Sequence, residues 1–298
     1  TAIFTAIIWL FKDNVVNLLV SILPGEDIMS AQMRLSVFHV IFNLSTTCML
    51  LPFVKHLVKL SCMIIKDKNE NAESLTLKYV DDRLLSMPPV ALMQVKKEMD
   101  YMLSLVEENT ALAFVAMETG SAEHSEHIRT NEDIINFTNS ALTQFLIKLS
   151  VNVEESDEKV IGSYFHVLND LERIGDHAEN FHEIGVEMID KNISFSPKAL
   201  GGITMMRDRI MQMFDISKEI FENLDKEKLP DLTVLEQGVD DMKREYIASH
   251  FARLAEGNCS VDVSPYYSSV ITGLERVADH LVNVGYSIMN PTGSQKNK

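Results

Sequence analysis

The sequence contains few cysteines and none of the short motifs that mark common catalytic sites. Its 298 residues include three cysteines, Cys48, Cys62 and Cys259, and no CxxC pair. An odd number of widely spaced cysteines does not form a disulfide framework, so a reducing compartment is the simpler interpretation. The G-x-S-x-G, P-loop and HExxH patterns are also absent. We therefore expect no catalytic residues and no enzyme activity.

The chain also lacks a surplus of positive charge. Its formal net charge is −16, which argues against nucleic acid as a partner and favours the attraction of cations. No convincing segment alternates apolar and polar residues with a period of two. The 46% of hydrophobic residues and 16 methionines instead suit helices with large apolar faces. We predict an all-α protein.

Residues 1–65 are predicted to be the end of a membrane domain. The chain does not start with Met and has no secretory signal, so we interpret it as a fragment that begins inside a larger protein. Residues 1–23 are apolar but interrupted by charges, as in the end of one span followed by a re-entrant or interfacial segment. Residues 35–54 contain no Asp, Glu, Lys or Arg, and about 20 such residues cross a bilayer as a helix.

The charges that flank residues 35–54 predict the orientation of this span. Glu26 and Asp27 precede it, and several lysines beginning with Lys55 follow it. By the positive-inside rule, the lysine-rich side faces the cytoplasm. We expect a multi-pass protein of the cell membrane, in contact with lipid, with residues 66–298 in the cytoplasm.

The predicted span carries a stripe of polar side chains. Ser36, His39, Asn43 and either Thr46 or Thr47 recur at spacings of three and four and so share one helix face. One interpretation is hydrogen bonding between membrane helices. The other is a face that lines a path for a polar solute or an ion. The sequence leaves both open.

The rest of the chain predicts a linker and a helical domain. Residues 66–89 are charged and irregular, and residues 291–298 form a tail. The six predicted helices cover residues 90–118, 131–151, 156–192, 197–224, 229–256 and 264–290. The third and sixth helices carry the same pattern, which predicts a duplication of three helices, with repeats at 90–192 and 197–290. Antiparallel packing is expected within this domain.

The duplicated pattern is the most informative feature of the sequence. Leu171–Asn180 reads LERIGDHAEN and Leu274–Asn283 reads LERVADHLVN, with the shared residues in register. Glu and Asp four residues apart lie on one helix face, where their charges repel unless a cation or a base neutralises them. Three such pairs, and a weaker fourth, occur at Glu172 and Asp176, Glu236 and Asp240, Glu275 and Asp279, and Glu132 and Asn136.

These faces suggest a metal site. If the helices of each repeat pack antiparallel, the carboxylates converge, and carboxylate sets bind hard cations, iron or manganese. The second repeat has four carboxylates and the first only three, so the prediction is stronger for the second. The side chains expected to support the ligands without binding the ion are His177, His280, Asn180 and Asn283. The simpler alternative is a solvated surface with weak ion pairs.

The motifs resemble those of the PhoU domain. The two copies of the pattern, with Glu236 and Asp240, carry the resemblance over residues 90–289. PhoU-like proteins consist of two three-helix repeats that regulate phosphate uptake, and in some the ExxxD motifs bind iron or zinc. The resemblance thus implies iron or zinc at these motifs, although Asn136 stands where the family has Asp.

The membrane segment resembles the end of a bacterial sodium/phosphate cotransporter. The segments 38–43 (FHVIFN) and 51–53 (LPF) resemble its final repeat, and 79–88 (YVDDRLLSMP) resembles the connector to a PhoU domain. This implies sodium-dependent transport of inorganic phosphate, with sodium as the coupling ion and a cytosolic regulatory domain. The implied transport residues are His39, Asn43, Thr46 and Thr47. The Gln-Ser-Ser substrate motifs of that family are absent from this chain.

Two other functions remain open at this stage. The first is a membrane-tethered, metal-binding regulator of phosphate uptake or signalling that transports nothing itself, with a regulatory protein or a second copy of the chain as partner. The second is a carboxylate-bridged metalloenzyme. The repeated pattern does not contain the Glu-x-x-His signature of di-iron bundles, which argues against the second function.

Overall fold

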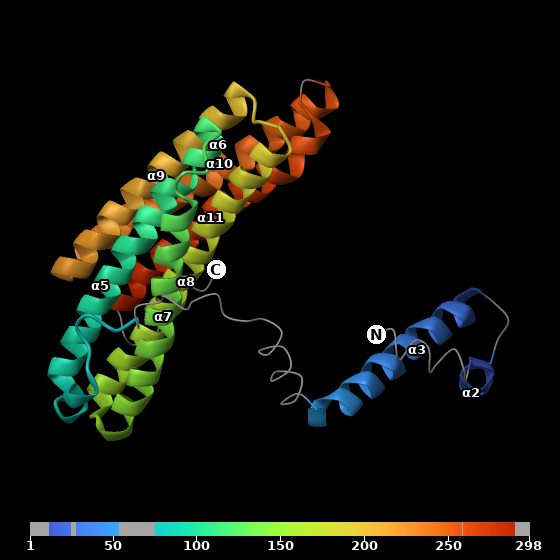
Figure 1. The fold of residues 1–298 in the computed structure, drawn as a ribbon, viewed down its shortest axis with the longest axis horizontal. Coiled ribbons are helices and arrows are strands. Elements are labelled where there is room, and N and C mark those ends of the chain that lie inside the picture. The colour runs from blue at the N-terminus through green and yellow to red at the C-terminus, as the bar shows by residue number, and fades with distance from the viewer. Residues whose placement is uncertain (1–11, 25–27, 54–74, 258, 290–298) are drawn as a thin grey trace. The chain divides into compact units, whose positions relative to one another are not determined.

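The computed structural model describes residues 12–24, 28–53, 75–257 and 259–289. The chain divides into two units, residues 1–73 and 74–298. All regular structure in the described ranges is helical, which confirms the all-α prediction (Figure 1). The two units are treated separately below.

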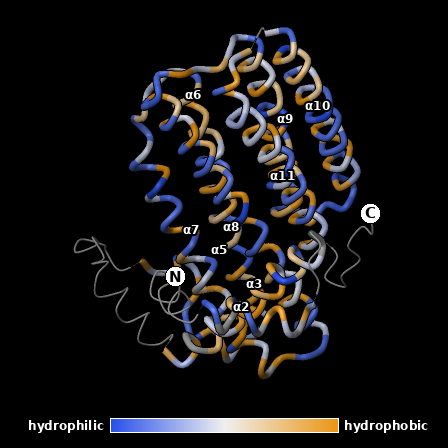
Figure 2. Tube along the Cα trace, turned by 90° about the vertical axis from the view of Figure 1, so that its right-hand side faces the viewer, coloured by the Kyte–Doolittle hydropathy of each residue, from blue (hydrophilic) through white to orange (hydrophobic). Residues whose placement is uncertain are grey.

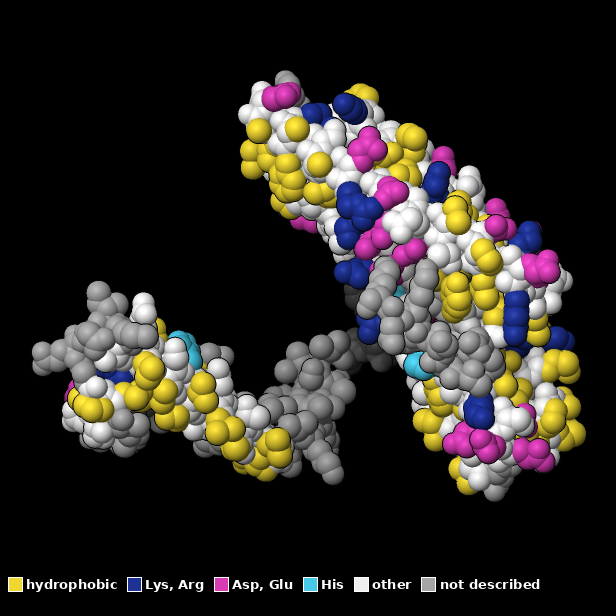
Figure 3. Space-filling view, turned by 180° about the vertical axis from the view of Figure 1, so that it is seen from behind, with side chains coloured by type: hydrophobic (Ala, Val, Ile, Leu, Met, Phe, Trp, Pro, Cys, Tyr) yellow, Lys and Arg dark blue, Asp and Glu magenta, His cyan; other side chains and the backbone are white. Residues whose placement is uncertain are grey.

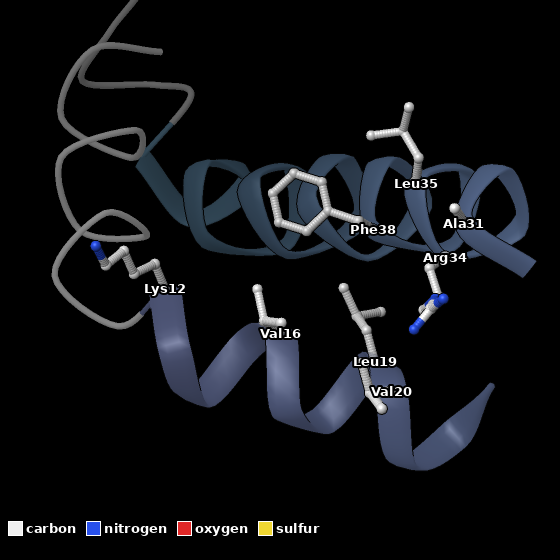
Figure 4. Close-up of a pocket in the computed structure, with 8 residues that line it drawn as sticks. All are labelled: Lys12, Val16, Leu19, Val20, Ala31, Arg34, Leu35 and Phe38. Carbon is white, nitrogen blue, oxygen red and sulfur yellow. The ribbon is translucent and has the colours of Figure 1, made fainter. Parts of the chain in front are cut away.

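The N-terminal unit contains two helices that pack against each other. They are α2 (Lys12–Ile22) and α3 (Ile28–Leu50), and a 3-10 turn (Leu51–Phe53) follows α3. A groove of about 440 Å³ runs between them, and its walls are mostly apolar (Figure 4). The groove is lined by Lys12, Val16, Leu19, Val20, Ala31, Arg34, Leu35 and Phe38.

One helix of the described residues, Ser30–Phe53, is long and apolar enough to cross a membrane. It starts before the predicted span of 35–54 and includes Arg34. The other helix of this unit, α2, has 11 residues, well short of the roughly 20 that span a bilayer. The described residues therefore do not support a multi-pass protein, and residues 1–11 and 54–65 of the predicted membrane segment lie outside them.

The C-terminal unit is a bundle of long helices joined by short turns (Figure 1). Its helices are α5 (Pro88–Ala113), α6 (Val115–Thr119), α7 (Ser125–Leu149), α8 (Glu155–Asp190), α9 (Pro197–Asn223), α10 (Leu229–Ala255) and α11 (Ser264–Met289). Proline stands in the first turn of α5, α9 and α10, where its missing N–H costs nothing. At α9, the Ser196 hydroxyl also accepts a hydrogen bond from the N–H of Ala199.

The two predicted repeats are present as two sets of three mutually packed helices. The first set is α5, α7 and α8, and the second is α9, α10 and α11. The sets join through α8 against α11 and α5 against α9, so that one hydrophobic core runs through both. Hydrophobic and hydrophilic residues are interspersed along the helices of the bundle (Figure 2). The two helices that carry the repeated pattern are thus the ones that meet at the centre.

The first predicted helix, 90–118, is broken at Phe114. Phe114 is 1% exposed, and its ring lies 5.1 Å from that of Phe181. The short helix α6 then packs closely on α8, where a Cβ added at Gly185 would lie 2.7 Å from the Cβ of Ala116. The break therefore depends on contacts between distant residues. Gly120, with φ of 71°, ends α6 in the left-handed conformation.

The predicted start of the second helix was also wrong. Helix α7 begins at Ser125, six residues before the predicted Asn131. Its first turn is polar and gives no apolar pattern, but Ile128 is 1% exposed and anchors the turn in the core. The side-chain amide of Asn109 on α5 donates to the carbonyl oxygen of Ile128 over 3.0 Å, which fixes the start of the helix.

Part of the predicted linker 66–89 belongs to the bundle. Residues 66–74 lie outside the described ranges, but the rest packs on α5. The carboxylate of Glu98, 1% exposed, accepts hydrogen bonds from the backbone N–H groups of Lys78 (3.1 Å) and Tyr79 (2.7 Å). Val80 is buried beside them. Residues 75–87 are therefore a connector held by side-chain contacts that sequence pattern does not reveal.

Candidate functional site

The repeated motifs meet where α8 crosses α11. The rings of His177 and His280 lie 6.1 Å apart at this contact. A Cβ added at Gly273 would lie 2.5 Å from the ring of Phe181, so only glycine fits there. The motifs are thus packed against each other through their histidine side, while their acidic residues face α7 and α10.

The two histidines have different partners. Nδ1 of His280 lies 2.8 Å from Oδ1 of Asp170, a residue of the other repeat, and donates to that carboxylate. The position of Asp170 in the first repeat corresponds to Gly273 in the second, so His177 has no matching carboxylate. Burial and the neighbouring His280 lower the pKa of His177. His280 therefore links the repeats, whereas the sequence predicted that it supports a local metal ligand.

In the first repeat, the acidic face contains a buried carboxylate that is poorly hydrogen-bonded. Glu132 on α7 is 3% exposed, and neither of its oxygens has a hydrogen-bond partner of good geometry among the described residues, although the Asn136 amide is close enough to lower its pKa. The same holds for the side-chain oxygen of Asn139, two turns further along α7. Buried acceptors are normally satisfied, and an orphaned one costs free energy. These three oxygens are therefore among the buried polar atoms of the described residues that need an explanation.

The surroundings of Glu132 are acidic. Burial, together with the charges of Glu179, Asp176 and Glu172, raises its pKa to about 7, and the nearby amide of Asn136 offsets a small part of this rise. Burial and Asp176 also raise the pKa of Glu172. The helices approach closely here, since a Cβ added at Gly175 would lie 3.0 Å from a Glu132 oxygen. No basic side chain is among the groups that shift the pKa of Glu132.

In the second repeat, the corresponding face contains its own cation. The Lys243 ammonium on α10 forms an ion pair of 3.1 Å with Oε2 of Glu275 on α11. The contact is electrostatic rather than a well-aligned hydrogen bond, because the same oxygen has no partner of good geometry among the described residues. Arg276 lies 3.6 Å from Glu275 and 3.4 Å from Asp279. Glu236 is 6% exposed, and Asp240 is half-buried.

The expected convergence of carboxylates is not observed. Among the described residues, no group of three or more His, Cys, Asp or Glu side chains is placed to hold a metal ion. In the second repeat, the donor set does not fit a metal, because Lys243 already neutralises Glu275. The first repeat keeps unsatisfied oxygens, so it is the better candidate. This reverses the preference for the second repeat that the count of carboxylates suggested.

Three of the predicted residues are exposed to solvent. Asn180 and Asn283 are exposed, and so is Asp176, although its charge acts on Glu132 and Glu172. On the face of the bundle in Figure 3, acidic and basic side chains are interspersed, as on an ordinary solvated surface.

The polar stripe of α3 is also exposed. His39, Asn43 and Thr47 are exposed, and the Thr46 hydroxyl donates to the carbonyl oxygen of Phe42 in its own helix. None of these side chains lines the groove between α2 and α3. The role of this stripe in transport stays a prediction.

The architecture defines the class of protein. It is a duplicated helical bundle of two three-helix repeats, in which the motif helix α8 of the first repeat packs against the motif helix α11 of the second. The family model described as "PhoU domain" matches residues 100–184 and 203–288, more than half of the chain. The chain belongs to the PhoU domain family. Its two matched segments correspond to the two repeats.

The match to one curated relative extends beyond the bundle. The chain is 22% identical to the "Putative inorganic phosphate export protein YjbB" of Escherichia coli (strain K12) over 258 residues, which is 85% of this chain and 47% of that protein. It is 24% identical to the "Phosphate-specific transport system accessory protein PhoU homolog 1" of Thermotoga maritima, over 64% of this chain and 82% of that one. The chain spans about half the length of the first relative. None of these matches confirms the sodium/phosphate cotransporter assignment.

Solved structures confirm the fold. PhoU from Pseudomonas aeruginosa superposes with a TM-score of 0.63 at 19% identity, covering 67% of this chain and 96% of that one. The phosphate transport system regulatory protein PhoU from Streptococcus pneumoniae gives 0.62 at 18% identity, covering 70% and 98%. Almost the whole of each solved PhoU chain is therefore matched by about two thirds of this chain.

Sequence reasoning missed Lys243, Asn139 and Asp170, which decide how the site differs between repeats. Lys243 follows Glu236 by seven residues, two helical turns, and so lies on the same face of α10. That spacing was a usable signal. Asp170 could not be recognised, because its partner His280 is 110 residues away.

Proposed function

We propose that the bundle is the regulatory part of a membrane protein that moves inorganic phosphate. The observation that carries this proposal is the joining of two units in one chain: a PhoU bundle, and a preceding helix that is apolar and long enough to cross a membrane. The bundle accounts for about three quarters of the chain, whereas the alignment with YjbB covers 85% of it and so reaches into the N-terminal unit.

The connector gives this regulation a physical route. Glu98 holds the backbone of Lys78 and Tyr79 against the first turns of α5, and Lys78 lies over the ring of Tyr101, 3.3 Å from its centroid. A change in the bundle therefore reaches the connector through charge-assisted hydrogen bonds rather than through loose chain. The lysines after the apolar helix support a cytoplasmic position for the bundle in this proposal.

The test compares phosphate flux in cells that produce the full chain or a connector variant. We expect the chain to change the rate of radioactive phosphate uptake or efflux, and Glu98→Ala to weaken that change because it frees the connector. Lys148→Ala is the matched control, because it removes only an exposed ion pair with Asp82 in the same region. Flux that is the same with and without the chain contradicts the proposal, as does an equal effect of the two variants.

Sodium-dependent phosphate transport by the chain itself is the second candidate. The exposed polar stripe of α3 favours it, because an uncovered row of hydroxyl, imidazole and amide groups suits a solute path in a membrane. The test is phosphate uptake into vesicles that contain the purified chain, with and without a sodium gradient. Uptake that needs sodium supports transport. A regulator without transport activity gives no uptake in either condition.

A further inference from the structure

The turn between α10 and α11 brings a cysteine next to a buried histidine. Cys259 lies in this turn, and its Sγ is 3.7 Å from Nδ1 of His250, a residue of the last turns of α10. Sγ also lies 3.8 Å from the carbonyl oxygen of Ser260. His250 is 1% exposed, whereas Cys259 is only partly buried. The thiol is thus accessible, while the imidazole beside it is held in the core.

Two contacts fix the imidazole of His250. Its Nε2 lies 2.8 Å from the hydroxyl of Ser264, the first residue of α11, and its ring centroid lies 4.7 Å from that of Tyr267. With the proton on Nε2 donating to Ser264, Nδ1 presents a lone pair to the thiol. Burial and the charge of Arg253 lower the pKa of His250, so the ring is neutral at neutral pH and can accept a proton. A nucleophile, a base and a group that orients the base are therefore together.

The first repeat has a different residue at the position of the histidine. The offset that relates Glu236 to Glu132 relates His250 to Leu146, which is fully buried. A polar ring costs free energy in such a place unless its hydrogen bonds are made. The bundle can therefore be built without a histidine here, which favours a chemical role for His250.

A cavity of about 270 Å³ adjoins the pair. Its walls are formed by Ser194, Phe195, Ser196, Pro197, Ala199, His250, Cys259, Ser260, Val263 and Tyr267. These described residues include three serines but no Asp, Glu, Lys or Arg, although the whole chain has a net charge of −16. Hydroxyl groups without a fixed charge suit a small, uncharged polar molecule better than an ion.

We propose that Cys259 is a reactive thiol whose substrate is a small hydroperoxide, with His250 as its base. Sγ attacks one oxygen of the peroxide, so that an S–O bond forms and the O–O bond breaks. The thiol proton passes to Nδ1 of His250 and then to the leaving oxygen, which departs as water when the substrate is hydrogen peroxide. The sulfur is oxidised by two electrons to a sulfenic acid, and the peroxide is reduced. This inference does not depend on the proposed function.

The test follows the oxidation of the full chain by hydrogen peroxide at pH 7. Dimedone traps the sulfenic acid, and peptide mass spectrometry gives the rate at Cys259, with N-acetylcysteine as the free-thiol reference. A free thiol is only a few per cent thiolate at this pH, so a base at Nδ1 should make Cys259 roughly tenfold faster than the reference. His250→Gln retains an amide that can reach Ser264 but has no base, and should return the rate to that of the reference.

His166→Gln is the matched control, because it replaces an exposed histidine of α8 in the other repeat and should leave the rate unchanged. Circular dichroism shows whether each variant is folded. If glutamine is not tolerated at position 250, His250→Ala with added imidazole decides the question. Imidazole should restore the rate, because the lost group is a base and not only a packed ring.

Four results would overturn the proposal. The first is a rate at Cys259 no higher than that of N-acetylcysteine, and the second is a folded His250→Gln protein with the wild-type rate. The third is a His250→Ala protein that is slow with and without imidazole. The fourth is faster modification by glutathione disulfide than by hydrogen peroxide, since the substrate would then be a large charged disulfide.

Discussion

The two repeats share a fold and a motif but neutralise their acidic faces in different ways. In the first, Glu132 is buried among carboxylates, with its pKa raised to about 7. In the second, Lys243 and Arg276 lie against Glu275 and Asp279. The difference teaches that a duplicated motif preserves geometry more strictly than charge. One repeat pairs its acidic face with basic side chains, and the other keeps a buried carboxylate whose charged form is disfavoured.

The contact between the two repeats is also asymmetric, because matched positions in the two repeats make different interactions. Asp170 of the first repeat bonds His280 of the second, and its counterpart Gly273 instead makes room for Phe181. Each of the four predictions below changes one side of this comparison.

The largest effect is expected at Gly273. Replacing Gly273 with Ala puts a Cβ 2.5 Å from the fully buried ring of Phe181 and should destabilise the bundle by about 2–4 kcal/mol, since overpacked cores relax poorly. Gly162→Ala in α8 is the control, because no atom lies within 4 Å of the new Cβ there, and helix propensity favours Ala by about 1 kcal/mol. Urea unfolding measures both. Equal stability of the two variants would refute the close approach of α8 and α11.

Glu132→Gln should stabilise the protein, and the gain should depend on pH. The folded pKa of about 7 lies above the ordinary glutamate value of 4.5, so the folded state binds the proton more tightly. Stability from this group is therefore fully present below pH 4.5 and is lost as the pH rises to 7, by about 3 kcal/mol. In EDTA, the Gln variant should gain roughly 2 kcal/mol or more at pH 8 and little at pH 4.5.

Glu236→Gln is the partner experiment in the second repeat. Its face has the charge of Lys243, so no comparable gain at pH 8 is expected. Denaturant unfolding at both pH values compares the two variants. An equal gain in both repeats would show that Lys243 does not distinguish them.

His280→Ala should cost about 2 kcal/mol, because it leaves the largely buried carboxylate of Asp170 without its partner. His177→Ala, at the matched position, loses a ring contact with Phe181 but no ion pair, and should cost less than half as much. Thermal unfolding of the two variants ranks them. If His177→Ala were the more destabilising, the asymmetry of the contact would be disproved.

The smallest effect is expected for Arg276→Ala. Its guanidinium is 56% exposed and lies 3.4 Å from Asp279, so the pair should contribute at most about 0.5 kcal/mol, and less in 0.5 M NaCl than at low salt. Comparison with Lys243→Ala separates the two cations of this repeat. A larger loss of stability for Arg276→Ala than for Lys243→Ala would show that Arg276 on α11, not Lys243 on α10, is the main neutralising charge of this repeat.

Helix positions and the duplication could be predicted from sequence because they rest on local patterns. The apolar period, the prolines at helix starts and the in-register motifs all act within a few turns. The break at Phe114 and the packed connector were missed, because each depends on a contact between residues far apart in the sequence. Phe114 packs on Phe181, and the connector is bound by Glu98. At the candidate site, the acidic residues were predicted, but the basic side chain that pairs with them in the second repeat was not. Counting carboxylates favoured the second repeat, and one lysine two turns away reversed that preference.

The buried carboxylate of Glu98 also restricts motion at the joint before α5. The backbone amides of Lys78 and Tyr79 donate hydrogen bonds to it. Rotation of this stretch of backbone would break both bonds and leave the buried carboxylate of Glu98 without these donors. A pull on the backbone of residues 78–79 is thus transmitted to Glu98, about three turns into α5. The two hydrogen bonds of Glu98 therefore couple tension in this stretch of backbone directly to a helix of the bundle.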